Sequence, residues 1–285
     1  MAFDKGRIPD NLKLAYNSGH CAVLIGAGAS AGAGLPTWWK LLELMITYAE
    51  ANHYTTAEKA KQYRKLLDKP EKYLLIAASL KEEIGNSFDD FMNKTFLEPA
   101  PKPTGLHKAL VALDKLQFVL TTNYDTIIER AYRVRKGDVS VCSFTDVGEI
   151  QRRLSKREFF ILKAHGDAAK AGNGLILTEG DYRRILYRER AYQSLMSAMF
   201  TMFTFLFVGA SMADPEIKLL LGYIADVFMP ESGPVHYALM DRDEITDVEE
   251  TRWQKDYRVK VIPISKKNDY REVTDFLKAL HSTAP

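Results

Sequence analysis

The chain has 285 residues, of which 46% are hydrophobic and 27% charged, and its formal net charge is +2 at pH 7. This length suits one large domain or two small ones with a substantial core, and the composition is that of a soluble globular protein. Because basic and acidic residues are interspersed and nearly balanced, nucleic-acid binding is not indicated.

The first predicted strand covers residues 21–25, which are apolar and uncharged, as expected of a strand buried on both faces. Small residues follow it: Gly26, Ala27, Gly28, Ala29, Ser30 and Ala31. Such a turn would leave backbone amides free to approach a pyrophosphate, and its glycines permit positive φ. The dinucleotide-binding fingerprint G-x-G-x-x-G is matched only if alanine replaces its third glycine. The acidic residue that usually follows about 20 residues later, at the end of a second strand, would here fall within a helical run, so an ordinary dehydrogenase is disfavoured. A tight turn without a ligand is the alternative.

A long helical segment comes next. Gly32, Gly34 and Pro36 would keep any helix directly after the turn short. From Thr37 onward, apolar residues recur at helical spacing and no strand pattern interrupts them before the prolines at 101 and 103. We therefore predict a helical insertion over about 37–103, between the first and second strands.

Polar residues follow the next buried strands, where open α/β sheets place their ligands. The predicted strand 117–120 leads to Asn123 and Asp125, and the strand 159–164 leads to His165, with a third strand at 139–144 between them. Asp125 could instead be the N-cap of the helix 126–133. Capping alone accounts less well for the presence of Asn123. His165 suits acid/base chemistry or a ribose contact, and a hydrogen-bonded structural histidine is the alternative.

The last part of the chain continues the alternation of strands and helices. Residues 174–177 suggest a short β-segment, and the strand 204–208 leads to Gly209 and Ser211. Ser211 could bind a phosphate or a ribose, whereas Asp214 before Pro215 is typical of a helix start. Strands at 235–240 and 259–264 alternate with helices. The pattern predicts an α/β fold, a doubly wound, mainly parallel Rossmann-like sheet in a single domain over 1–285.

Several features bear on the cellular compartment. The first twenty residues lack the apolar core of a secretory signal, and residues 195–212 are better divided between a helix and a strand than read as a membrane span. Cys21 and Cys142 lie in apolar, strand-like contexts, so no disulfide framework is expected. We expect a cytoplasmic protein with no membrane contact. The lack of Cys-x-x-Cys or histidine-rich clusters predicts no metal.

Four strand ends in this order, residues 26–30, 122–125, 165–166 and 209–211, together with Gly34-Leu35-Pro36, resemble the sirtuin family of NAD-consuming enzymes. The resemblance covers roughly residues 20–265, and it is greatest to the sirtuin-like NAD-hydrolase domains of bacterial anti-phage defence systems. It implies that Asn123 and His165 are catalytic, with His165 acting on a ribose hydroxyl or an attacking water. It also implies an NAD site formed by Gly26, Ala27, Gly28, Ser30, Pro36, Asn123, Asp125, His165, Gly209 and Ser211.

Two departures from the protein-deacylating sirtuins are visible. The paired Cys-x-x-Cys motifs of a zinc ribbon are absent, and Thr37-Trp38-Trp39 stands where those enzymes usually continue with Asp-Phe-Arg. The resemblance therefore favours an NAD glycohydrolase, with NAD as substrate and no metal, which depletes NAD in anti-phage defence by abortive infection. The alternatives are an NAD-dependent protein deacylase or ADP-ribosyltransferase, and a non-catalytic module that senses NAD or ADP-ribose. We expect activity to be gated by homo-oligomerisation or by a separately encoded activator such as an ATPase.

Overall fold

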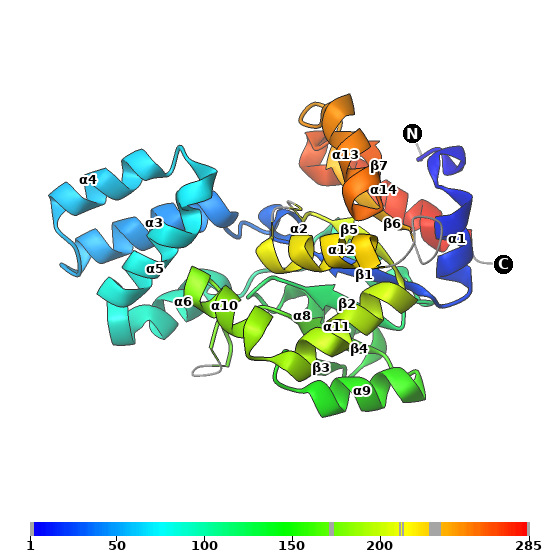
Figure 1. The fold of residues 1–285 in the computed structure, drawn as a ribbon, viewed down its shortest axis with the longest axis horizontal. Helices are drawn as coiled ribbons and strands as arrows, with labels where there is room; N and C mark the ends of the chain where they lie inside the picture. The colour runs from blue at the N-terminus through cyan, green and yellow to red at the C-terminus, as the bar shows by residue number, and fades with distance from the viewer. Residues whose placement is uncertain (1–2, 171–173, 211, 213, 228–234, 284–285) are drawn as a thin grey trace.

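The computed structural model describes residues 3–170, 174–210, 212, 214–227 and 235–283, and within them seven strands form one sheet. The strand order is β3-β4-β2-β1-β5-β6-β7, and every neighbouring pair is parallel (Figure 1). The strands are β1 (Cys21–Ile25), β2 (Phe118–Thr121), β3 (Ser140–Ser143), β4 (Phe160–Lys163), β5 (Thr204–Val208), β6 (His236–Asp241) and β7 (Val259–Ile264). The predicted parallel sheet is confirmed, and each strand boundary lies within one residue of its expected position.

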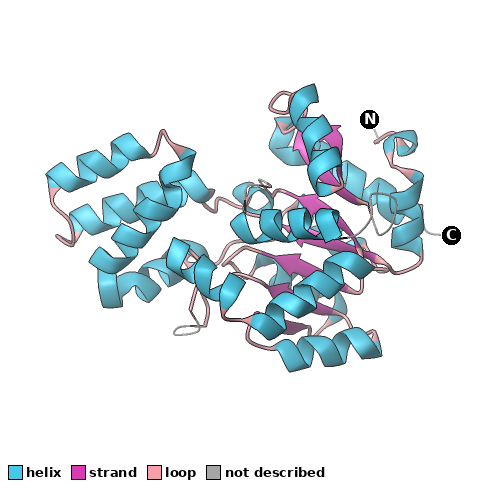
Figure 2. Ribbon diagram, viewed as in Figure 1, coloured by secondary structure: helices cyan, strands magenta, loops and turns pink. Residues whose placement is uncertain are grey.

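Helices cover both faces of the sheet (Figure 2). One face carries α1 (Asp10–Asn17), α7 (Gly105–Ala112), α8 (Ile127–Lys136) and α14 (Lys267–His281). The other carries α9 (Val147–Lys156), α10 (Glu179–Tyr187), α11 (Arg190–Met202), α12 (Pro215–Val227) and α13 (Asp247–Tyr257). Alternate residues of β1 enter the two cores, with Val23 in the first and Leu24 in the second. Both faces of the strand are therefore apolar, which explains its uninterrupted hydrophobic run.

The expected helical insertion lies between β1 and β2 and projects from one end of the sheet (Figure 1). It comprises α3 (Trp38–Ala51), α4 (Ala57–Leu66), α5 (Tyr73–Ile84) and α6 (Phe88–Leu97), with 3-10 turns at Pro70–Lys72 and Gly85–Ser87. The short helix α2 (Gly28–Ala31) lies before it, in the turn after β1, and another 3-10 turn, Lys5–Arg7, precedes α1. The insertion has its own apolar core, which also takes in Tyr124 after β2 and Leu175 after β4. The rings of Phe96 and Tyr124 meet edge to face, with centroids 5.4 Å apart. The insertion is thereby joined to the loops at the carboxyl ends of the strands.

Residues 174–177 do not form the short β-segment that their sequence suggests. They run as a loop beside the end of β4, where the amide of Ile176 donates to the carbonyl oxygen of His165 at 3.1 Å. The hydroxyl of Tyr124 donates to the carbonyl oxygen of Ile176 at 2.6 Å. The Tyr124 side chain thus bonds the carbonyl oxygen of Ile176, which a neighbouring strand would otherwise bond, and residues 174–177 lie outside the sheet.

None of the described helices has both the length and the apolar composition needed to cross a membrane. The feature that positions a site is instead the central strand. From β1 the chain first adds β2 on one side and only later adds β5 on the other. The connections after β1 and β5 therefore lead to strands on opposite sides of this pair, which makes the ends of β1 and β5 a topological switch point, where open α/β sheets form their ligand crevices.

Candidate functional site

The turns that follow β1 and β5 are bonded to each other through their backbones. The amide of Gly26 donates to the carbonyl oxygen of Val208 at 3.0 Å, and that of Gly28 to the carbonyl oxygen of Gly209 at 2.9 Å. A β-carbon at Gly26 would lie 2.7 Å from the carbonyl oxygen of Gly209, and one at Gly209 would lie 2.3 Å from the amide nitrogen of Ala29. Gly209 also has a φ of +63°. Glycine is required here because two backbones approach each other closely.

This packing corrects one expectation about the glycine-rich turn. The amides of Ala29 and Ser30 donate to the carbonyl oxygens of Gly26 and Ala27, at 3.0 and 3.1 Å. With the amides of Gly26 and Gly28, four amides of the turn bond to protein oxygens and are not free to meet an anion. The small side chains still leave Ala27 and Gly28 partly exposed at the edge of the sheet. Pro36, on the way to α3, is partly buried.

Asn123 and Asp125 extend from the end of β2 to the same turn. The Nδ2 of Asn123 donates to the carbonyl oxygen of Gly26 at 3.2 Å and to the Oγ of Ser30 at 3.0 Å. The Ser30 hydroxyl donates in turn to Oδ2 of Asp125 at 2.9 Å, while Oδ1 of Asp125 accepts the amide of Ile127 at the start of α8. The N-cap of α8 is Thr126, not Asp125, but the Asp125 carboxylate accepts the first amide of the helix and also joins the network. The Oδ1 of Asn123 is buried and has no hydrogen-bond partner among the described residues.

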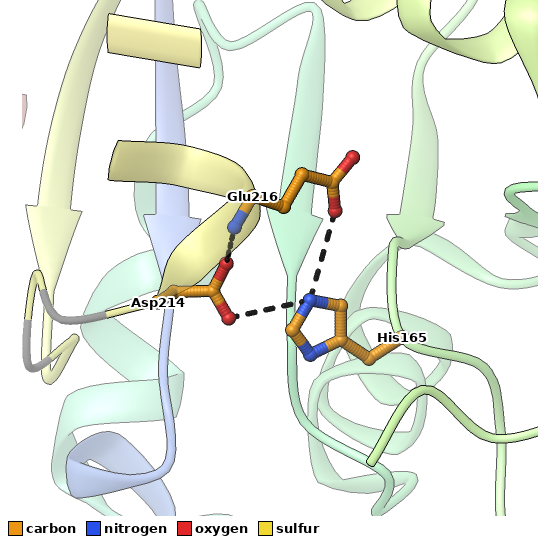
Figure 3. Close-up of side chains that lie close together, drawn as sticks. All are labelled: His165, Asp214 and Glu216. Atoms are coloured by element: carbon orange, nitrogen blue, oxygen red, sulfur yellow. Dashed lines mark hydrogen bonds and ion pairs between the residues drawn. The ribbon is translucent and has the colours of Figure 1, made fainter. Parts of the chain in front are cut away.

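His165 follows β4 and faces two carboxylates from the start of α12 (Figure 3). Its Nε2 lies 3.4 Å from Oδ2 of Asp214 and 3.7 Å from Oε2 of Glu216. Asp214 accepts two backbone amides at the start of α12 through Oδ1 and the hydroxyl of Tyr182 through Oδ2, at 2.8 Å. Glu216 accepts Nε2 of Gln193 through Oε1 at 2.9 Å. Both carboxylates are therefore held in fixed orientations.

The electrostatics of this cluster follow from burial and from charge. Burial by itself lowers the pKa of His165, but the carboxylates of Asp214 and Glu216 act in the opposite direction and the pKa is raised. Burial raises the pKa of Glu216, and the imidazole of His165 opposes that shift. One ligand atom from each of the three residues lies within 4.8 Å of the other two, so the cluster is also the candidate metal centre among the described residues.

A buried lysine supports the loop after β2. The Nζ of Lys163, in β4, forms ion pairs with Glu129 at 2.9 Å and Asp167 at 3.2 Å. It also donates to the carbonyl oxygens of Tyr124 and Asp125, at 3.4 and 2.5 Å. Its side chain is 1% exposed. The buried ammonium group of Lys163 thus holds the loop after β2 in place through its backbone carbonyls.

Sequence reasoning found some of these residues and missed others. It identified Asp214 as a helix cap, which is confirmed, but not its contact with His165. Glu216 and Lys163 were missed, although an acidic residue directly after a strand-end turn is a usable signal. Ser211 lies outside the described residues. Binding of NAD by the predicted site residues stays a prediction.

An open parallel sheet with buried polar side chains gathered at the ends of adjacent strands defines a Rossmann-like α/β protein. The chain belongs to the SIR2-like family, because the family model described as a SIR2-like domain matches residues 117–262. The sirtuin resemblance seen in the four strand ends is confirmed by this match.

Curated relatives agree with this family. The chain is 27% identical to Defense-associated sirtuin 2 of Bacillus subtilis, over 73% of the chain and 19% of that protein. It is 25% identical to the NAD(+) hydrolase ThsA of Bacillus cereus, over 92% of the chain and 54% of that protein, and 24% identical to ThsA of Enterococcus faecium, over 97% and 58%. The chain therefore spans between about a fifth and three fifths of these relatives. A solved Sir2 homologue in complex with ADP-ribose gives a TM-score of 0.41 at 14% identity, with 96% of each chain covered.

Proposed function

We propose that the chain is an NAD glycohydrolase that releases nicotinamide and ADP-ribose and depletes NAD in anti-phage defence. The names of the relatives, NAD(+) hydrolase and defense-associated sirtuin, support this proposal. The observation that carries it is the state of Asn123, whose Nδ2 is bonded to Gly26 and Ser30 while its buried Oδ1 has no partner among the described residues. Such an acceptor, fixed in orientation and without a partner, is suited to a substrate group.

The chemistry makes modest demands on the protein. The nicotinamide of NAD is cationic and leaves as a neutral molecule, so the enzyme must stabilise positive charge on the ribose and admit a nucleophile. The Oδ1 of Asn123 can accept a hydrogen bond from an attacking water or from the nicotinamide carboxamide. Because its amide group is already fixed, little reorganisation is needed when the substrate binds.

His165 supplies the acid/base group in this proposal. Its Nε2 faces Asp214 and Glu216, and Nδ1 lies on the opposite side of the ring (Figure 3). Nδ1 is then the nitrogen that takes a proton from a ribose hydroxyl or from water. A general base of this kind contributes on the order of 10²- to 10⁴-fold in rate. The two carboxylates stabilise the imidazolium that forms.

The remaining predicted contacts belong to the same proposal. Residues 1–285 act as one NAD-binding domain with the helical insertion at its side. Asp125 faces the nicotinamide ribose through its network with Ser30. The pyrophosphate and adenosine lie along the turns after β1 and β5, beside Gly26, Ala27, Gly28, Ser30, Pro36, Gly209 and Ser211.

The test is to incubate the purified chain with NAD at several protein concentrations and to quantify nicotinamide, ADP-ribose and cyclic products. We expect release without any peptide, reduced at least about 10³-fold in Asn123→Ala and His165→Ala. Asn93→Ala is the control, since Asn93, a partly buried asparagine of the insertion, likewise donates through Nδ2 to a backbone carbonyl, that of Ala168. Its turnover should stay within about twofold of the original.

Other products would point to the other readings. Nicotinamide release that requires an acetyl-lysine peptide would identify a deacylase, and ADP-ribose attached to protein would identify a transferase. Binding of NAD without release, at every concentration, would favour a sensing module. Activity that rises more steeply than protein concentration would support gating by a homo-oligomer, and activity that appears only with a second protein would support a separate activator.

A further inference from the structure

Three potential ligand atoms from the ends of β4 and β5 converge: Nε2 of His165, Oδ2 of Asp214 and Oε2 of Glu216 (Figure 3). The two nitrogen–oxygen distances are 3.4 and 3.7 Å. A charge-assisted hydrogen bond is shorter, at about 2.7–2.9 Å. Neighbouring ligand atoms around a tetrahedral zinc ion, each bonded at about 2.0–2.1 Å, are separated by roughly 3.3 Å. The spacing is therefore nearer to that of ligands around an ion than to that of hydrogen-bonded partners.

Two of these atoms are buried and unpaired. Nε2 of His165 and Oε2 of Glu216 have no hydrogen-bond partner among the described residues. His165 is 3% exposed and Glu216 0%. A buried polar atom left without a partner is unfavourable, because it has lost its bonds to water and gained none in return. Both atoms point into the space they share with Asp214, so the unused bonding capacity lies where an ion would sit.

Neutral donors hold both carboxylates in place. Tyr182 donates to Oδ2 of Asp214, which keeps further lone pairs for an ion, and Gln193 donates to Oε1 of Glu216. Backbone amides at the start of α12 occupy Oδ1 of Asp214. Groups of this kind surround metal ligands in proteins, where they fix the orientation of each ligand and raise its affinity for the ion.

The charges also favour a cation. Nε2 of His165 faces both carboxyl groups. Burial of ionised carboxylates is costly unless a cation compensates their charge. A divalent cation held by a neutral imidazole would balance both carboxylates.

We propose that His165, Asp214 and Glu216 bind a divalent transition-metal ion of the zinc class, and that the bound ion inhibits NAD hydrolysis. A mixed imidazole and carboxylate set suits zinc, whereas magnesium prefers oxygen ligands alone. The ion would occupy Nε2 of His165 and place positive charge near a ribose that must itself become positive. The inhibition rests on the proposed function, whereas the binding does not. It would act as a brake on an enzyme that consumes NAD.

The binding test uses the full chain after removal of metals with a chelator. Zinc is titrated by calorimetry, and cobalt, as a coloured substitute, by visible absorption. We expect one ion per chain, cobalt bands typical of four-coordinate sites, and affinity at least about 100-fold weaker in Glu216→Gln. Glu249→Gln is the control, because Glu249 is likewise a carboxylate in the first turn of a helix, α13, and should leave affinity unchanged.

Equal zinc affinity in the original chain and in Glu216→Gln would overturn the proposal, because the ion would then sit elsewhere, for instance at a cysteine. Circular dichroism of the metal-free variants checks folding, and Glu216→Asp, which shortens the side chain while keeping its charge, is the second variant. Its affinity should also fall by at least about tenfold. No measurable zinc binding by the folded original chain would equally reject the site.

The inhibition test compares NAD turnover with and without zinc. Half-maximal inhibition is expected at the zinc concentration that half-saturates the calorimetric site, with reversal by chelator and no effect of magnesium. Zinc that binds at this cluster without slowing turnover would refute the inhibitory role. If the chain shows no hydrolase activity at all, the calorimetric comparison still decides the binding site. Failure of the proposed function and failure of the metal site are thus distinguishable.

Discussion

The hydroxyl of Ser30 donates a 2.9 Å hydrogen bond to the carboxylate of Asp125 and thereby joins the turn after β1 to the start of α8. The same oxygen accepts a hydrogen bond from the side-chain Nδ2 of Asn123. A single small side chain thus holds two residues of the neighbouring strand end. The orientation of the open Oδ1 of Asn123 depends on it.

Ser30→Ala should impair turnover more than folding. Removal of the hydroxyl leaves Nδ2 of Asn123 with only the carbonyl oxygen of Gly26, so the side chain gains freedom to rotate. We expect kcat/KM for NAD to fall about 10- to 100-fold and the free energy of unfolding to fall by about 1–2 kcal/mol. Steady-state kinetics and urea unfolding measure the two effects. Ser155→Ala, at an exposed serine bonded within α9, should change neither.

Lys163→Met should destabilise the protein strongly. The substitution leaves Glu129 and Asp167 buried without their cation, a change that typically costs about 3–5 kcal/mol. Adding Glu129→Gln should recover part of that loss, because one of the stranded charges is removed. Chemical unfolding of the two single variants and the double variant forms a double-mutant cycle. Additive losses would show that the lysine and glutamate are not coupled, and Lys170→Met, at an exposed position, should have little effect.

Two glycine substitutions should have opposite signs. Gly209→Ala places a methyl group 2.3 Å from the amide nitrogen of Ala29 at a φ of +63°, and we expect a loss of at least about 3 kcal/mol in the free energy of unfolding. Gly148→Ala, in α9 with open space around it, should instead stabilise by about 0.5–1 kcal/mol. Thermal and urea unfolding test both. A mild effect at Gly209 would mean that the two turns do not approach as closely as described.

Acid should weaken the protein through His236. Burial lowers the pKa of this histidine to about 3, and its Nδ1 accepts the amide of Phe205 at 3.1 Å, as a neutral ring must. Since the unfolded chain binds a proton near pH 6.5 and the native one does not, stability falls as the pH drops from about 6.5 toward 3. His236→Asn should lose about 2 kcal/mol less than the original between pH 6.5 and 4.5. His53→Asn, at an exposed site, should follow the original.

Much of the fold could be predicted because each strand can be recognised from its own local sequence. A strand such as β1, buried on both faces, reads as an uninterrupted apolar run, and the small residues after β1 and β5 mark where those strands end. Asn123, Asp125 and His165 were found for the same reason, since each directly follows such a strand. Residues 174–177 were misread because a side chain, Tyr124, supplies the hydrogen bond that a strand neighbour would have supplied.

The rest depends on contacts between distant parts of the chain. The glycines after β1 were expected to free their amides, yet the amides of Gly26 and Gly28 meet carbonyl oxygens of a turn far along the sequence. The cluster of His165 and Glu216 joins two separate strand ends, so no short motif marks it. The expectation of no metal rested on the lack of closely spaced ligands in the sequence, and this criterion does not register side chains that only the fold brings together. That expectation stays a prediction.

The bonds between the turns after β1 and β5 also determine when the site can exist. The turn after β1 is synthesised before β2, β3 and β4, whereas its partners at Val208 and Gly209 follow those strands. Until then the amides of Gly26 and Gly28 lack their acceptors, and no hydrogen bonds from the β5 side hold the turn in its final conformation. A growing chain therefore cannot assemble the crevice. Under the proposed function, this order of synthesis would keep the nascent chain from hydrolysing NAD until β5 joins the sheet.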